Sequence, residues 1–170
     1  HLPFYRWPTF NLADAGSIPT NLSVLIIASP QLDLLPGEVR LVRDYVESGG
    51  NLLWLADPGE SGGMASIAER LGVEFLPGVI VDASTQLFGI QSPDVVLVPA
   101  YPPHPVTREL QAMTLFPHTQ ALQFNDGEDW QAEVLLSSME NTWTEIGAME
   151  GEIQYSEGTD ERAGPLDIAY

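Results

Sequence analysis

Three side chains that could do chemistry, Asp57, Asp82 and His104, each follow an apolar stretch typical of a buried β-strand. In an open α/β sheet, ligands bind beyond the carboxyl ends of the strands, so side chains at these positions can meet in one site. Two carboxylates and an imidazole could hold a divalent metal ion or perform acid–base catalysis. We therefore take the three residues as candidate ligand-binding residues, and a metal-dependent hydrolase is the enzyme that they would suit.

The same residues also have a purely structural explanation. Asp57 begins the tripeptide Asp57-Pro58-Gly59, which is common in turns because Asp accepts backbone N–H bonds while Pro and Gly supply the dihedral angles. His104 lies between prolines in PPHPVT, which indicates a rigid loop, and Thr107 resembles the N-cap of a helix. We favour the turn for Asp57 and the loop for His104, and we assign neither a catalytic role nor a bound metal.

Other kinds of catalytic site are excluded by the residues that the chain lacks. There is no Lys, so a phosphate-binding GxxxxGK[ST] loop cannot form. There is no Cys, which removes thiolate nucleophiles and zinc–thiolate sites. Ser29 and Ser84 follow strand-like runs, but neither lies between glycines in the tight turn that a serine nucleophile elbow requires. The sequence therefore predicts no cofactor and no catalytic nucleophile.

The charge of the chain is strongly negative. Asp and Glu number 24 against six Arg, and the net charge at pH 7 is −18. Nucleic acids and anionic membrane surfaces are bound through Lys and Arg, so neither is an expected partner. An acidic surface keeps a protein soluble and would suit a salt-rich habitat, because salt screens the repulsion between like charges. The sequence leaves open which of the two explanations holds.

Apolar runs and helical spacing alternate along the first hundred residues. A helix is predicted to begin near Pro36 and to end at Gly49-Gly50, since apolar residues recur at helical intervals between them. Alternating strands and helices are typical of an α/β fold with right-handed crossovers and a mainly parallel sheet. The other elements predicted here are strands at 23–29, 51–56, 79–82 and 94–100 and a short helix at 64–72.

The remainder of the chain is less regular. Residues 115–124 and 130–138 are predicted to be strands of an antiparallel extension, and 165–170 a last strand. The acidic, glycine-rich stretch 150–164 is predicted to be a mobile loop. We see no linker that would separate domains and expect one domain over residues 1–170. Because the chain starts without Met and stops within a strand-like stretch, we expect it to be part of a longer protein.

Several segments together resemble the auxiliary-component family of ABC-type transport systems, the type associated with gliding motility. The residues that carry this resemblance are IPTNLSVLIIASP, LPGEVRLVRDYVESGGNLLWLADPG, HPVTREL and TLFPHTQAL. The block at 18–59 is the most specific part, and the resemblance extends to the final GPLDIAY. Asp57 and His104 fall in the recurring DP and HP motifs of that family.

The resemblance implies an extracytoplasmic domain at the periplasmic face of the inner membrane, beside an ABC permease and ATPase. Transmembrane segments outside this sequence would anchor it. The implied fold is a three-layer, mainly parallel α/β sheet, similar to flavodoxin-like and glutamine-amidotransferase-like folds, with an antiparallel C-terminal extension. The amidotransferases use a Cys that this chain lacks, so their chemistry is not carried over.

The leading hypothesis is thus a non-catalytic domain that acts by protein–protein contact or by binding a solute. The metal-dependent hydrolase with Asp57, Asp82 and His104 remains an alternative, as does a module that binds carbohydrate or another small solute. The transported substrate and the oligomeric state do not follow from the sequence.

Overall fold

The chain divides into two compact units in the computed structural model. Unit 1 comprises His1–Ala56 and Gly62–Ile67, and unit 2 comprises Asp57–Ser61 and Ala68–Tyr170. The single domain expected over residues 1–170 stays a prediction. The structure describes residues 9–59, 61–125, 127, 129–149, 151 and 153–170.

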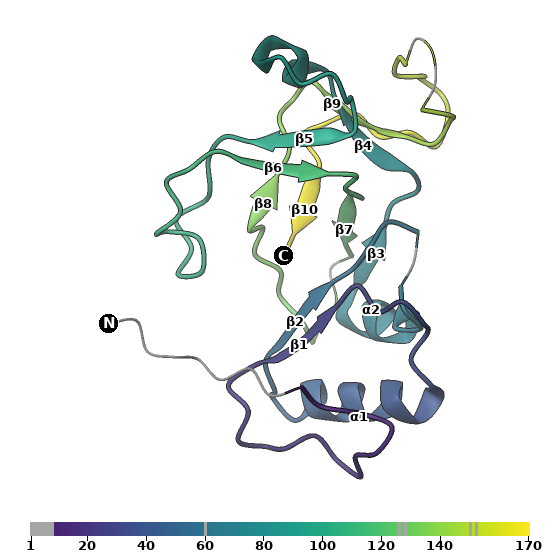
Figure 1. The fold of residues 1–170 in the computed structure, drawn as a ribbon, viewed down its shortest axis with the longest axis vertical. Helices are drawn as coiled ribbons and strands as arrows, with labels where there is room; N and C mark the ends of the chain where they lie inside the picture. The colour runs from purple at the N-terminus through teal and green to yellow at the C-terminus, as the bar shows by residue number, and fades with distance from the viewer. Residues whose placement is uncertain (1–8, 60, 126, 128, 150, 152) are drawn as a thin grey trace. The chain divides into compact units, whose positions relative to one another are not determined.

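Unit 1 contains a strand–helix–strand arrangement (Figure 1). β1 (Leu25–Ala28) leads through α1 (Pro36–Glu47) to β2 (Leu52–Leu55). The two strands pair in parallel, with Leu25 beside Leu52. The strand, helix and strand predicted between residues 23 and 56 are therefore confirmed.

The ends of α1 follow from local residue chemistry. Pro36 occupies the first turn, where a missing N–H costs nothing. The Glu38 carboxylate accepts the backbone N–H of Leu35 at 2.7 Å, which satisfies one of the exposed donors at the helix start. At the other end, the Tyr45 hydroxyl donates to the carbonyl of Asn51 at 3.2 Å. This bond joins the last turn of the helix to the start of β2.

Burial in β1 alternates along the strand, with Leu25 and Ile27 buried and Ile26 exposed. The sequence predicted a strand that is buried on both faces, so that detail is wrong. A parallel strand is covered on both faces only where helices lie on both sides of the sheet. The buried apolar side chains of unit 1 include Leu25, Ile27, Val42, Tyr45, Val46, Met64 and Ile67.

A short helix, α2 (Ala65–Leu71), leads from unit 1 into unit 2 and confirms the helix predicted at 64–72. Among the described residues, no helix combines the length and the apolar character that crossing a bilayer requires.

Unit 2 is built from antiparallel strands. Its largest sheet has the order β3-β7-β10-β8, so the last strand of the chain lies between two earlier ones. All of its neighbouring strands run antiparallel. The strands of this sheet are β3 (Val73–Phe75), β7 (Leu122–Phe124), β10 (Asp167–Ala169) and β8 (Leu136–Ser137).

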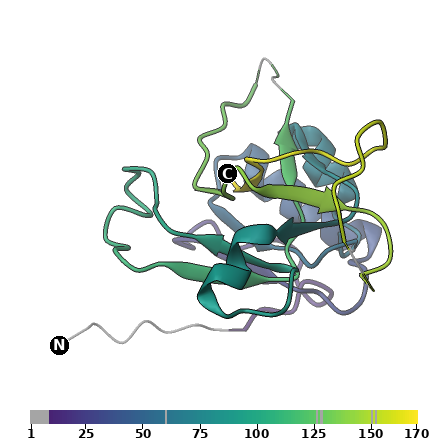
Figure 2. The ribbon, with the colours of Figure 1, turned by 90° about the horizontal axis from the view of Figure 1, so that it is seen from above.

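Two further antiparallel pairs are described in unit 2. β4 (Val79–Asp82) pairs with β9 (Thr142–Glu145), and β5 (Val95–Val98) pairs with β6 (Thr114–Pro117). The 3-10 helix η1 (Ala83–Phe88) follows β4 and stands out in the view from above (Figure 2). The apolar core cluster of this unit consists of Leu76, Ile80, Val96, Ala121 and Leu166, with Phe116 and Ile168 packed against it.

The three-layer, mainly parallel α/β sheet of flavodoxin-like or glutamine-amidotransferase-like type is therefore wrong as a prediction. Within the described part of the chain, parallel pairing is confined to β1 and β2. The runs at 79–82 and 94–100 do form strands, but each pairs with an antiparallel neighbour. A short, continuously apolar run shows that a strand is buried, and it does not show the direction of its partner.

Boundaries in the C-terminal part also differ from the prediction. The segment 115–124 divides into β6 and β7, and His118 between them adopts a left-handed φ of 50°. The predicted strand at 130–138 reduces to the two residues of β8. The last strand at 165–170 is confirmed as β10. The predicted loop at 150–164 contains no strand among its described residues, and residues 150 and 152 lie outside them.

Candidate functional site

Asp82 is fully buried where β4 meets η1. Its carboxylate accepts hydrogen bonds from the backbone N–H of Ser84 at 2.9 Å and from the Ser84 hydroxyl. It also accepts the backbone N–H of Leu97, in β5, at 3.0 Å. A buried carboxylate needs such donors to offset the loss of water. Asp82 thus caps η1 and ties it to β5.

Asp57 is exposed and begins a turn. The turn predicted at Asp57-Pro58-Gly59 is confirmed, with Gly59 at a φ of 76° that favours glycine. The N–H of Gly59 donates to the side-chain oxygen of Gln120 at 3.0 Å. The turn is thereby fastened to the segment that precedes β7.

His104 is half-buried in the loop between β5 and β6. Its Nδ1 accepts the N–H of Val106 at 3.1 Å, and its Nε2 lies 3.3 Å from a carboxylate oxygen of Glu133. The sequence suggested Thr107 as the N-cap of a helix, but no helix begins there. The Thr107 hydroxyl donates to the carbonyl of Pro102 at 2.7 Å and closes the loop. The rigid loop interpretation of His104 matches these bonds.

The structure gives Asp82 and His104 separate sets of partners. Among the described residues, no group of three or more His, Asp and Glu side chains is arranged to hold a metal ion. The metal-dependent hydrolase therefore gains no support from this part of the chain, and the ligand-binding role of the three residues stays a prediction.

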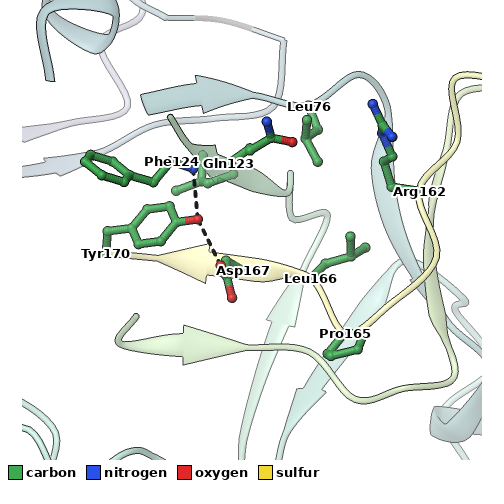
Figure 3. Close-up of a pocket in the computed structure, with 9 residues that line it drawn as sticks. Leu76, Gln123, Phe124, Arg162, Pro165, Leu166, Asp167 and Tyr170 are labelled. Atoms are coloured by element: carbon green, nitrogen blue, oxygen red, sulfur yellow. Dashed lines mark hydrogen bonds between the residues drawn. The ribbon is translucent and has the colours of Figure 1, made fainter. Parts of the chain in front are cut away.

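A feature that the sequence did not predict is an open pocket of about 320 Å³ in unit 2 (Figure 3). It lies beside β7 and β10, which pair through one residue pair only, Asp167 with Leu122. The residues that line the pocket are Leu76, Leu122, Gln123, Phe124, Arg162, Pro165, Leu166, Asp167 and Tyr170.

One wall of the pocket is a chain of hydrogen bonds centred on Tyr170 (Figure 3). The Tyr170 hydroxyl accepts the backbone N–H of Phe124 at 3.1 Å and donates to Asp167 at 2.9 Å. The Ser137 hydroxyl donates to the other oxygen of Asp167 at 3.0 Å. Burial and the bond to Asp167 raise the pKa of Tyr170 to about 12, so the hydroxyl keeps its proton at neutral pH.

Arg162 contributes a positive charge to the same pocket. Its guanidinium makes no hydrogen bond and no ion pair within the described part of the chain. By contrast, three other arginines lie within 4 Å of a carboxylate, namely Arg43, Arg70 and Arg108.

Sequence reasoning missed this pocket because its residues come from distant segments. Arg162 lies in a stretch interpreted as an acidic loop, and Asp167 and Tyr170 lie in one interpreted as a strand. The one available signal was an isolated Arg among acidic residues, and that pattern does not indicate which residues lie beside it in the fold.

The sequence matches the family described as "ABC-type uncharacterized transport system" over residues 2–168. The chain belongs to this family. The auxiliary-component resemblance is thereby confirmed over nearly the whole chain, and membership indicates an auxiliary component of an ABC-type transport system.

The chain is similar to a solved structure titled "mmIFT52 N-terminal domain", with a TM-score of 0.53 and 15% sequence identity. The likeness covers 74% of this chain and 58% of that one, so this chain spans little more than half of its length. At this identity the likeness concerns the fold alone. No curated protein matches the sequence.

Proposed function

We propose that residues 1–170 form a non-catalytic, extracytoplasmic domain of an ABC transporter auxiliary subunit, acting by protein–protein contact or by binding a solute. The observation that carries the proposal is the family match over residues 2–168. The domain would lie at the periplasmic face of the inner membrane, beside the permease and the ATPase, and segments outside this sequence would anchor it.

The environment of the strand-end residues supports a non-catalytic role. The Asp82 carboxylate already accepts bonds from Ser84 and Leu97, so it is not free to act as a base. His104 is engaged through both ring nitrogens, by Val106 and Glu133. We therefore expect the purified chain to hydrolyse no generic ester, amide or phosphate substrate.

The tip of η1 is the surface that best fits a contact role. Leu87 is 86% exposed and Phe88 is 56% exposed. The helix that presents them is held by Asp82 at its start and by the bond from the N–H of Ile90 to the carbonyl of Thr85 at its end. Apolar side chains exposed on a fixed support favour burial against another protein. We propose the permease as that protein.

Charge supports a protein partner for this tip over a lipid surface. The chain carries a net charge of −18, which opposes approach to anionic lipid. The same charge favours a partner whose contact surface has a basic rim.

Co-purification of the full-length protein with its transporter tests the proposal. We expect the wild type to retain the permease and ATPase, and a Leu87→Ser/Phe88→Ser variant to lose them. Leu32→Ser is the matched control, because Leu32 is 85% exposed in unit 1 and should be dispensable. A wild type that retains neither subunit would contradict the proposal, whereas full retention by the η1 variant would contradict only the contact surface.

A further inference from the structure

Strand β6 lies at an open edge of its sheet. Among the described residues, this sheet consists of β5 and β6, so β6 has a neighbouring strand on one side only. Figure 1 shows the two strands side by side, with the chain leaving β5 in a loop and returning as β6. An open edge presents unpaired backbone N–H and C=O groups, and these are a ready template for another strand.

The hydrogen bonds of β5 determine which backbone groups of β6 point outward. Leu97, which lies opposite Leu115, donates its N–H to the carboxylate of Asp82 and not to β6. Opposite residues of an antiparallel pair alternate between exchanging both backbone bonds and exchanging none. The bond from the N–H of His118 to the carbonyl of Asp94, at 2.7 Å, fits the same alternation. Leu115 therefore turns its N–H and its C=O away from β5, and within the described part of the chain neither group has a partner.

The side chains along this edge are apolar and exposed. Leu115 is 50% exposed, and Met113, just before the strand, is 49% exposed. Phe116 packs against the core cluster of unit 2 and so holds the strand in place. Natural proteins usually protect an open edge with charged side chains. No charged residue occurs from 110 to 125, so β6 lacks this protection.

Charge decides which partner strand the edge of β6 suits. Two copies of a chain with a net charge of −18 repel each other, so they can meet only where neither presents acidic side chains. The uncharged edge of β6 meets that condition. A basic partner would instead be attracted to acidic surface, and β6 offers it no opposite charge. The edge therefore favours a second copy of this chain over a basic protein.

We propose that two copies of this chain pair through β6, with the strands antiparallel and the pairing centred on Leu115. Under a two-fold axis this residue is complementary to itself, because its outward N–H meets the C=O of its counterpart and its C=O meets the counterpart's N–H. The β5–β6 pairs of the two copies then form one continuous sheet, and the two Leu115 side chains pack together across the axis. The inference goes beyond the proposed function, since it concerns a second copy and not the transporter.

Sedimentation equilibrium of the purified chain tests the pairing. We expect a reversible dimer in a concentration series up to about 1 mM, which reveals even weak association. The mass of a single chain throughout, or an assembly larger than a dimer, would overturn the proposal.

Sodium chloride distinguishes this pairing from a contact between opposite charges. We expect tighter pairing at 1 M than at 0.1 M salt, because the screening length of the repulsion falls from about 10 Å to about 3 Å. Pairing that is weaker at 1 M would show that opposite charges hold the copies together, and it would overturn the proposal.

Two substitutions at one position test the backbone bonds and the apolar contact. Leu115→Pro removes an outward N–H that the fold does not use, and proline is tolerated on an edge strand in that orientation. Leu115→Lys places two like charges directly opposite each other in the dimer. We expect each variant to raise the dissociation constant of the dimer by about tenfold or more.

Leu55→Lys is the matched control, because Leu55 is a strand residue of unit 1 with a similar exposure of 51%. We expect this variant to dimerise like the wild type. Wild-type affinity in Leu115→Lys would overturn the proposal whatever the proline variant does. An equal loss of affinity in Leu55→Lys and Leu115→Lys would also overturn it.

A disulfide tests the register of the two strands. The chain contains no Cys, so Leu115→Cys introduces one thiol per copy. In a hydrogen-bonded antiparallel pair the Cα atoms lie about 5.5 Å apart, a distance that a disulfide can bridge. We expect mild oxidation to link two copies of Leu115→Cys and to leave Leu55→Cys unlinked at the same protein concentration.

Equal rates of linking in the two cysteine variants would overturn the proposed register and with it the proposal. These assays contain no transporter subunit and no substitution in η1. A failure here is therefore separate from a failure of the wild type to co-purify with the permease and ATPase.

Discussion

The side-chain carboxylate of Asp82 accepts the backbone N–H of Leu97 at 3.0 Å and so links the end of β4 to β5. From the sequence, Asp82 is a candidate ligand-binding residue because it follows an apolar stretch typical of a strand. Its burial and its bonds to Ser84 give it a structural task, which is to hold the 3-10 helix η1 on the strands beneath it.

Removing the Asp82 carboxylate should destabilise the protein. Asp82→Ala leaves the buried N–H groups of Ser84 and Leu97 without an acceptor, and we expect a loss of about 2–4 kcal/mol in the free energy of unfolding. Urea denaturation at neutral pH measures it. Asp160→Ala is the control, because Asp160 is exposed and its loss should change stability by less than about 0.5 kcal/mol. Equal effects of the two substitutions would show that the Asp82 bonds do not stabilise the fold.

Gly78 should tolerate no side chain. Its φ is 82°, and a Cβ there would overlap the carbonyl oxygen of Glu145 in β9. Gly59 is the matched control, because its φ of 76° is similar but a Cβ there would meet nothing within 4 Å. An alanine at Gly59 therefore has the backbone penalty without the steric clash. We expect Gly59→Ala to cost about 1–2 kcal/mol from the left-handed backbone alone. Gly78→Ala should cost at least about 2 kcal/mol more, or prevent folding, because a clash with backbone is added. Similar melting temperatures for the two variants would contradict the close approach of Gly78 to β9.

Tyr170 should make the protein sensitive to alkali. Its pKa is raised from 10.0 to about 12 in the folded protein, so folding favours the protonated hydroxyl. The stability that it contributes is complete below pH 10 and is lost as the pH rises from about 10 to about 12. Tyr170→Phe should therefore lose less stability than the wild type over this interval, as measured by urea midpoints. Tyr155→Phe, at an exposed position, should keep the wild-type slope. A wild-type slope in Tyr170→Phe would contradict the raised pKa of Tyr170.

Divalent cations test the hydrolase alternative directly. The described residues contain no group of three acidic or imidazole side chains placed to hold a metal. We expect Mg²⁺, Ca²⁺ and Zn²⁺ to raise the melting temperature of the wild type no more than those of Asp57→Ala and His104→Ala. A saturable increase that both variants lose and that chelator reverses would instead favour the metal-dependent enzyme.

Salt should stabilise the protein. A net charge of −18 generates self-repulsion in the compact state, and added salt shortens the distance over which it acts. The screening length falls from about 10 Å at 0.1 M salt to about 3 Å at 1 M. We expect the melting temperature to rise between these sodium chloride concentrations. A melting temperature indifferent to salt would contradict a role for charge repulsion.

Local signals in the sequence were sufficient to locate several elements. Pro36 and the glycines at 49 and 50 mark the ends of α1 because their backbone preferences act within a few residues. The strand predicted at 79–82 coincides with β4, since β-branched residues concentrate there.

The pairing of the strands could not be predicted from the sequence, because it depends on residues that lie far apart along the chain. β9 was missed since its residues Thr142–Glu145 include few apolar side chains, and yet Thr144 is fully buried. The Thr144 hydroxyl accepts the N–H of Arg162 at 2.8 Å, a bond that only the folded chain reveals. The strand that pairs with β4 was thus invisible to an apolar pattern, and the parallel sheet was predicted in its absence.

The candidate site likewise has one part that the sequence predicts and one part that it does not. The turn at Asp57 could be read from three consecutive residues, and the pocket could not. Phe124 and Tyr170 meet there across 46 positions of sequence, and no local pattern encodes such a meeting.

The place of β10 between β7 and β8 has a consequence for how the protein is made. Synthesis proceeds from the N-terminus, so β3, β7 and β8 leave the ribosome before the strand that joins β7 to β8 exists. The two strands described in unit 1, β1 and β2, are complete by residue 55 and can pair early. The largest sheet of unit 2 cannot close until Asp167–Ala169 has emerged. Until then its edges stay open, and folding of this sheet is slow because its contacts are distant in sequence.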